Sequence, residues 1–143
     1  MGGVSEKETL LWQLDLAWSL LQRLMKDRSD EQCLREPAPG SWSVRPDAAG
    51  NWSADWADEE PSPPPPTSIG WLLWHIGWWW SDVAERAFGN GSVSREEAPR
   101  PGSVDQARRS LLACQERWRG GLILDNGSAT LRRGPPSSVT ITS

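Results

Sequence analysis

The segment from Thr67 to Phe88 constrains the fold more than any other part of this chain. It holds five of the eleven tryptophans and the only histidine, His75. At about 100° per residue, most of its apolar side chains fall on one broad face of a helix, which predicts that this face packs against a core. These residues are Ile69, Leu72, Leu73, Ile76, Trp79, Trp80, Val83 and Ala87. Trp74 and Trp78 point roughly the opposite way, so the helix needs cover on two sides.

Both ends of this helix are marked in the sequence. The run Pro63–Pro66 cannot be helical, and Thr67 is a suitable N-cap. The turn residues Gly89-Asn90-Gly91 mark the other end, which predicts a helix over residues 68–88. Its uncharged part is shorter than the roughly 20 apolar residues that a bilayer requires, so we expect no membrane span.

An amphipathic helix is predicted near the start of the chain. Ser5 and Glu8 have the spacing of a capping box, and leucines then recur at three- and four-residue steps, which predicts a helix over residues 6–27. Ser29 to Gln32 forms a second, weaker capping box. It predicts a short helical turn that ends near Arg35.

A third long helix is predicted over residues 104–119. Ser103 and Gln106 again have capping-box spacing, and the pair Gly120-Gly121 is typical of a helix end. The remaining residues, 120–143, are mainly polar and lack helical spacing. We therefore expect one helical domain over residues 1–119, followed by an irregular tail over 120–143.

The long connection over residues 36–66 contains eight prolines and shows no periodicity. It also carries Trp42, Trp52 and Trp56. Indoles gain nothing from exposure to water, so we expect part of this loop to pack across the helices as a lid. The stretch from Glu59 to Pro66 is expected to be extended.

Composition limits the functions open to this chain. The net charge is −4 with both signs interspersed, so there is no basic patch to attract a nucleic acid. Cys33 and Cys114 lie in unrelated contexts, and the N-terminal residues are polar. We therefore expect a reduced, cytoplasmic protein with no nucleic-acid or membrane partner.

Several motifs together resemble the DinB-like (DinB/YfiT-like) family, in particular its actinobacterial members. They are an N-terminal amphipathic helix, SDEQCL at 29–34, PGSWSVRPD at 39–47 and TSIGWLLWHIGWW at 67–79. The resemblance covers roughly residues 5–119 and implies an all-α, up-down-down-up four-helix bundle. It also implies a divalent metal held by three histidines, and some branches are transferases or isomerases that use bacillithiol or mycothiol.

This chain departs from that pattern at the metal site. His75 matches the first ligand position, whereas the other two histidines normally come from the fourth helix and are absent here. We therefore expect the fourth helix to be missing or replaced. One imidazole cannot hold zinc or nickel against water, and Asp82 lies two turns away, about 10 Å along the axis. His75 is the single candidate ligand of an incomplete site, and we expect no tightly bound metal and no activity from the chain as it stands.

Two hypotheses from different classes remain. In the first, a DinB-like metalloprotein acts on a small thiol-linked or electrophilic substrate, in a pocket lined by Trp42, Trp71, Trp79 and Asp82. In the second, the scaffold is a non-catalytic helical module. Its exposed tryptophan-rich helix then forms a homodimer or holds another protein.

Overall fold

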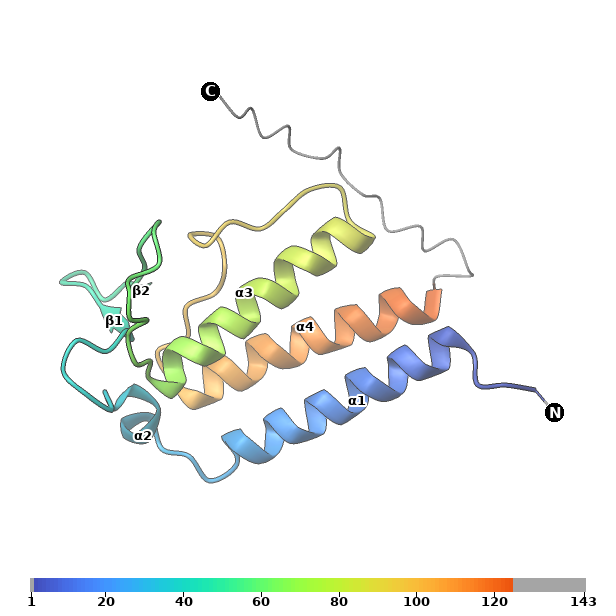
Figure 1. The fold of residues 1–143 in the computed structure, drawn as a ribbon, viewed down its shortest axis with the longest axis horizontal. Helices are drawn as coiled ribbons and strands as arrows, with labels where there is room; N and C mark the ends of the chain where they lie inside the picture. Colours follow the sequence, from blue (N-terminus) through green and yellow to red (C-terminus); the bar gives the residue numbers. More distant parts are fainter. Residues whose placement is uncertain (1, 125–143) are drawn as a thin grey trace.

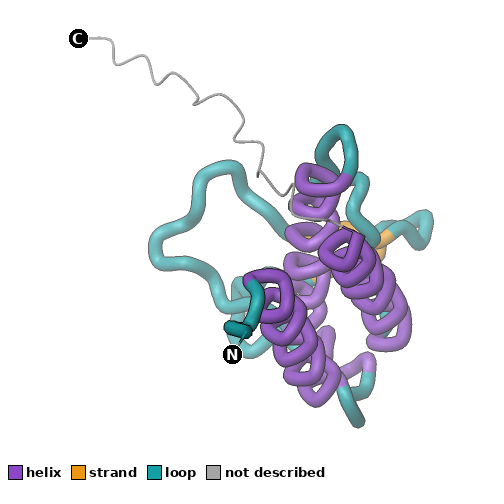
Figure 2. The backbone as a smooth tube through the Cα atoms, turned by 90° about the vertical axis from the view of Figure 1, so that its right-hand side faces the viewer, coloured by secondary structure: helices purple, strands orange, loops and turns teal. Residues whose placement is uncertain are grey.

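Three long helices form the body of the protein in the computed structural model, which describes residues 2–124. They are α1 (Glu6–Met25), α3 (Ile69–Phe88) and α4 (Val104–Leu124), and a five-residue helix, α2 (Asp30–Leu34), follows α1. Helix α4 packs against both α1 and α3 and lies between them in Figure 1. Figure 2, viewed nearly along the long helices, shows them grouped together. Within the described residues, no helix is both long and apolar enough to cross a membrane.

The fold is all-α, as predicted, apart from one small two-stranded sheet. Two short strands, β1 (Val44–Pro46) and β2 (Trp52–Ala54), pair antiparallel with Val44 opposite Ala54. Asp47 closes the turn between them, because its side chain accepts hydrogen bonds from the backbone N–H groups of Ala49 and Asn51. Gly50 has a φ of +83°, a conformation that glycine adopts without strain. The loop predicted to have no regular structure therefore contains a β-hairpin.

The start of each helix depends on a serine cap. The capping boxes at Ser5 and Ser29 are present as predicted. The cap of α3 is Ser68 rather than the predicted Thr67, since the Ser68 hydroxyl accepts the N–H of Trp71 at 3.1 Å. Thr67 instead forms a parallel β-bridge with Trp42. The prediction was wrong by one residue because both positions carry a capping hydroxyl.

Helix α4 continues five residues beyond the predicted end at Arg119. Gly121 lies inside the helix rather than at its end, and its missing side chain leaves room for the ring of Phe88. A Cβ atom at this position would lie 2.5 Å from the ring of Phe88 on α3. Residues 120–124, predicted to be irregular, are therefore helical. The rest of the predicted tail, and with it the prediction of a missing or replaced fourth helix, falls on residues 125–143, outside the described part of the chain.

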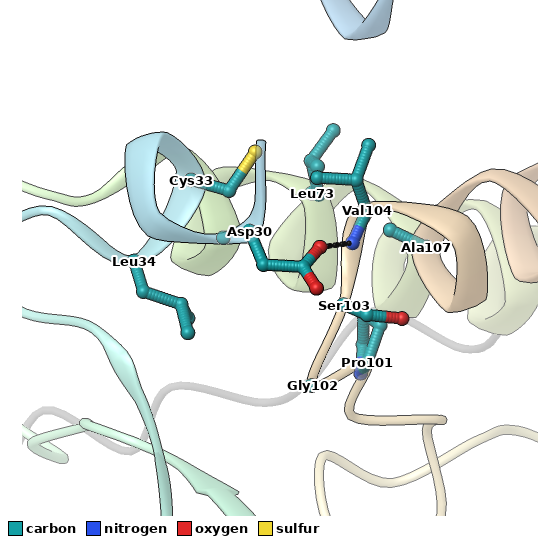
Figure 3. A pocket seen from close by; sticks show the side chains of 10 residues that line it. Asp30, Cys33, Leu34, Leu73, Pro101, Gly102, Ser103, Val104 and Ala107 are labelled. Atoms are coloured by element: carbon teal, nitrogen blue, oxygen red, sulfur yellow. Dashed lines mark hydrogen bonds between the residues drawn. The ribbon is translucent and has the colours of Figure 1, made fainter. Parts of the chain in front are cut away.

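The main core lies where α4 contacts the other helices. Its buried residues are Trp18, Leu21, Met25, Cys33, Leu73, Val104, Ala107 and Leu111. Helix α2 is tied to this core by Asp30, whose carboxylate accepts the N–H of Val104 at 2.8 Å and so caps the start of α4 (Figure 3). The short helix thereby fixes the end of the bundle at which α4 begins.

The predicted core face of α3 is only partly buried, which is a second correction. Leu72 is 44% exposed and Trp79 is 50% exposed, whereas Trp74, predicted to point away, is 2% exposed. The reason lies in the preceding loop, whose tryptophans cover the other side of α3. Periodicity within one helix could not indicate which of its two apolar sides would be covered.

Candidate functional site

His75 lies within a cluster of aromatic rings on one side of α3. We call it the indole cluster, and it comprises Trp42, Trp56, Trp71, Trp74, Trp78 and Trp79. The imidazole stacks on Trp71 with ring centroids 4.8 Å apart and planes 12° apart. Trp56 is also nearly parallel to the imidazole, at 6.2 Å and 24°. The side chains of Trp74, Trp78 and Trp79 surround the ring at tilted or edge-on angles.

Two segments of the chain build this cluster. Helix α3 supplies four of its indoles; Trp71, Trp74 and Trp78 follow at steps of three and four residues, which places them on one side of the helix, and Trp79 comes directly after Trp78. The loop supplies the other two, and hydrogen bonds hold it in place. The indole N–H of Trp71 donates to the backbone oxygen of Asp55 at 2.8 Å, and the hydroxyls of Ser43 and Ser68 lie 2.8 Å apart.

A cation closes the loop side of the cluster. The guanidinium of Arg95 lies 4.8 Å from the ring centre of Trp56, within the range of a cation–π contact. Arg95 also pairs with Asp58 at 3.5 Å. The loop therefore covers α3 as predicted, and Arg95, from the connection that follows α3, holds its outer edge.

Two polar atoms are enclosed in the cluster without a hydrogen-bond partner among residues 2–124. They are Nδ1 of His75 and Nε1 of Trp74. Burial lowers the pKa of His75 below its ordinary value of 6.5, because a charged imidazole loses its hydration there. His75 is therefore neutral at neutral pH. A neutral imidazole is a metal ligand, so its charge state alone does not decide its role.

The donor set around His75 does not fit a divalent metal. Zinc and nickel sites need three or more converging donors, and residues 2–124 contain no group of three His, Cys, Asp or Glu side chains placed to hold an ion. The neighbours of the imidazole are indoles, and the indole N–H only donates hydrogen bonds. The remaining residues of the sequence add Asp125 as their single side chain of these four types.

The other residues predicted to line a pocket are divided between several surroundings. Trp42 and Trp71 lie together, with ring centroids 5.6 Å apart, in the indole cluster. Trp79 contacts His75 on one side and lines a groove on the other. Asp82 binds Arg86 and the backbone N–H of Val93, both at 2.9 Å. These bonds lower the pKa of Asp82 against the raising effect of desolvation, and they engage its carboxylate away from the imidazole.

A second feature lies on the opposite side of α3. An open groove of about 510 Å³ runs between α1 and α3, with α4 contributing its C-terminal part. We call it the apolar groove, and it is lined by Leu10, Gln13, Leu14, Ala17, Trp79, Trp80, Val83, Trp118 and Leu122. None of these side chains is charged. The groove therefore suits an apolar occupant better than an ionic substrate.

The other cavities are smaller than the apolar groove. The space beside Cys33 measures about 10 Å³, room for one water at most (Figure 3). Burial raises the pKa of the Cys33 thiol, with a further contribution from Asp30, so this cysteine is not an activated nucleophile. Cys114 lies 3.2 Å from the hydroxyl of Ser81 at the α3–α4 contact. Both cysteines are free thiols.

Sequence reasoning missed four residues of the site: Trp56, Trp74 and Trp78, which lie against the imidazole, and Arg95, which lies over the ring of Trp56. A signal existed for two of them, because Trp74, His75 and Trp78 lie at steps of one and three residues along the same part of the helix. No local pattern marks the loop residue or the arginine. Their positions depend on how the connections fold back.

Three packed helices, a short capping helix and a histidine enclosed by tryptophans on the second long helix make this chain a helical domain. The comparison with protein families agrees, since the family model of the DinB superfamily matches residues 13–138. The chain belongs to the DinB superfamily. No match was found among curated proteins or among solved structures.

Proposed function

We propose that this DinB-superfamily chain acts by binding, and that its apolar groove takes up an amphipathic α-helix of a protein partner. The observation that carries the proposal is the groove itself, which measures about 510 Å³, is bounded by three long helices and is free of charged side chains. A groove of this kind takes the apolar face of one helix. The same proposal makes the chain a non-catalytic module.

The arrangement of the long helices supports a helical occupant. Helix α4 packs against α1 on one side and α3 on the other, so the groove faces the position that a fourth long helix would take in a bundle. Trp79 of α3 and Leu10 of α1 line the groove and are exposed, and Leu72 is exposed two turns before Trp79 on α3. A partner helix would bury these side chains, and each fully buried one stabilises the complex by about 1.5–3 kcal/mol.

A metal-dependent enzyme is the second candidate, since the DinB-like resemblance implies that His75 matches a zinc or nickel ligand position. The enclosed Nδ1 atom, which has no partner among the described residues, is the observation that favours it. Against it stand the indole surroundings of the imidazole and the lack of further donors in residues 2–124. A thiol-dependent transferase or isomerase acting on a small molecule would require such a metal. We therefore propose the binding function ahead of this enzymatic activity.

Binding can be measured by fluorescence anisotropy with two labelled peptides. The first is an 18-residue amphipathic helix of leucine, lysine and glutamate with no net charge, and the second has the same composition in a scrambled order. We expect the amphipathic peptide to bind and the scrambled peptide to bind at least about tenfold more weakly, a difference of about 1.4 kcal/mol. Equal binding of the two peptides would contradict the proposal.

A matched pair of variants tests the place of binding. Val83→Arg puts a charge into the apolar groove, whereas Leu112→Arg puts the same charge on α4 at an exposed leucine that does not line it. We expect the first variant to lose the amphipathic peptide and the second to retain it. Loss in both, or in neither, would place the binding surface elsewhere.

Elemental analysis separates the two candidates. After incubation with zinc or nickel and removal of free metal, we expect far less than one ion per chain, because a single imidazole is a weak site. One tightly held ion per chain that disappears in His75→Ala would replace the binding proposal with the metalloenzyme.

A further inference from the structure

A pocket at the far end of α1 and α3 differs from the apolar groove in charge. It measures about 390 Å³, and we call it the arginine pocket. Figure 1 shows the end of α1, helix α2 and the start of α3 at this end of the bundle. The lining residues are Arg28, Gln32, Arg35, Pro37, Thr67 and Ile69. Each polar side chain among them can donate hydrogen bonds and none is acidic, so the pocket suits a carboxylate.

Both arginines are available to such a group. Within residues 2–124, neither Arg28 nor Arg35 forms an ion pair. Nε of Arg28 donates to the backbone oxygen of Leu24 at 3.2 Å, which holds this guanidinium against the last turn of α1. The two side chains therefore offer positive charge at a defined place.

The acidic side chains of the same segment do not fill the arginine pocket. Asp30 caps the start of α4, and Glu36 pairs with Arg45. Asp27 and Glu31 do not line the pocket. The two guanidinium groups thus lack a carboxylate partner within the described residues.

Exposed leucines join the arginine pocket to the apolar groove. On α3, Leu72 lies three residues after Ile69 of the pocket and seven before Trp79 of the groove, so the three side chains share one face. On α1, Leu24 lies seven residues after Ala17 of the groove, again on the same face. Leu72 is 44% exposed and Leu24 is 63% exposed. Apolar surface therefore continues from the groove to the arginines.

Resting on the proposed binding function, we infer that the partner helix carries carboxylates at one end, which the arginine pocket binds while the apolar face of the helix lies in the apolar groove. One helix is long enough for both contacts. Ile69 and Val83 lie about 21 Å apart along α3, and an 18-residue helix is about 27 Å long. The uncharged groove accepts a helix in either direction, whereas the arginines select the end that lies beside them.

Three labelled peptides test this inference by fluorescence anisotropy. Each has the amphipathic sequence designed for the groove and ends in two glutamates, two glutamines or two lysines, with acetyl and amide groups to remove the terminal charges. At low salt we expect the glutamate peptide to bind at least about fivefold more tightly than the lysine peptide, because two attractive pairs replace two repulsive ones. High salt should reduce this difference, since both arginines are exposed. Equal binding of the three peptides at low salt overturns the inference.

Charge reversal on the protein is the matched test. When Arg28→Glu and Arg35→Glu are combined, we expect the lysine peptide to become the tighter ligand. Arg109→Glu makes the same change at an exposed side chain of α4 that lines neither the groove nor the arginine pocket, and it should keep the wild-type order. The melting temperature of each variant checks folding. Should the double variant be unstable, Arg35→Glu alone is expected to reduce the preference for glutamate, and an unchanged preference in either variant overturns the inference.

The outcomes for the two proposals can be told apart. Peptides that bind equally well, and that Val83→Arg releases, retain the proposed function and overturn only the acidic end of the partner. A preference for glutamate that survives Val83→Arg retains the arginine pocket and overturns the groove as the binding surface. Self-association that excludes all three peptides makes a second copy of the chain the occupant and overturns the inference.

Discussion

The two sides of α3 differ in what covers them. On one side the loop brings Trp42 and Trp56 onto the helix and encloses His75 in the indole cluster. On the other side Trp79 borders an open groove. Both sides are rich in apolar residues, so hydrophobicity alone does not decide which is buried. The covered side is the one that a neighbouring segment reaches, and the open side is left uncovered by the other segments of residues 2–124.

The sharpest way to test this contrast is to remove the most buried indole. Trp74→Ala should lower the free energy of unfolding by about 3–5 kcal/mol, since Trp74 is 2% exposed in the indole cluster. Trp12→Ala is the matched control, because that side chain is 63% exposed, and it should change stability by less than about 1 kcal/mol. Urea denaturation at low protein concentration measures both. Similar losses would mean that the two indoles are equally buried.

Two adjacent leucines on α3 make the same comparison within one turn. Leu73 is 5% exposed and contacts the main core, whereas Leu72 is 44% exposed. Leu73→Ala should cost about 2–5 kcal/mol, and Leu72→Ala about 1 kcal/mol or less. Thermal unfolding at low protein concentration distinguishes the two variants. If Leu72→Ala proved the more damaging change, the open side would be the buried one.

Asp55 tests how firmly the loop covers its side. Its carboxylate accepts the N–H of Ser43 at 2.9 Å and pairs with Arg45 at 3.0 Å. Asp55→Ala leaves the backbone N–H of Ser43 without this acceptor, so we expect a loss of about 1–3 kcal/mol. Increased quenching of tryptophan fluorescence by acrylamide should accompany it. Arg109→Ala, at an exposed pair on α4, is the control and should change neither quantity.

The smallest expected effect is the pH dependence that His75 contributes. Burial holds its pKa in the folded protein below 6.5, so the unfolded chain binds a proton more readily. This contribution to stability is fully present above pH 6.5 and is lost as the pH falls toward the lowered pKa of the folded state. His75→Phe should remove that part of the pH dependence, measured as the difference between urea midpoints at pH 7.5 and pH 5.5. If the midpoint changed by the same amount between the two pH values in the wild type and in His75→Phe, the enclosed position of the imidazole would be contradicted.

Local signals predicted the helices well, because their starts depend on neighbouring residues. The boxes at Ser5 and Ser29 lie where the sequence placed them. The errors arose where distant residues compete with such signals. Gly121 has the chemistry of a helix end, yet the ring of Phe88, 33 positions earlier, makes it a point of close packing.

The site was predicted less completely than the fold. His75 stood out because it is the only imidazole, and Trp71 because it lies one turn before it. Trp56 and Arg95 reach the same place from two separate connections, and their approach depends on bonds such as that between Trp71 and Asp55. The apolar groove was anticipated only as an exposed tryptophan-rich face. Its walls come from three helices, and no single segment contains that information.

The hydrogen bonds of Asp55 also bear on how the molecule opens. Its side chain holds the first strand and its backbone oxygen holds the indole of Trp71, so the hairpin cannot leave α3 while either bond persists. The amide protons of the hairpin and the indole proton of Trp71 should therefore exchange with solvent as one cooperative unit, separate from the main core. Solvent then reaches His75 through local opening of the hairpin, without unfolding of the three long helices.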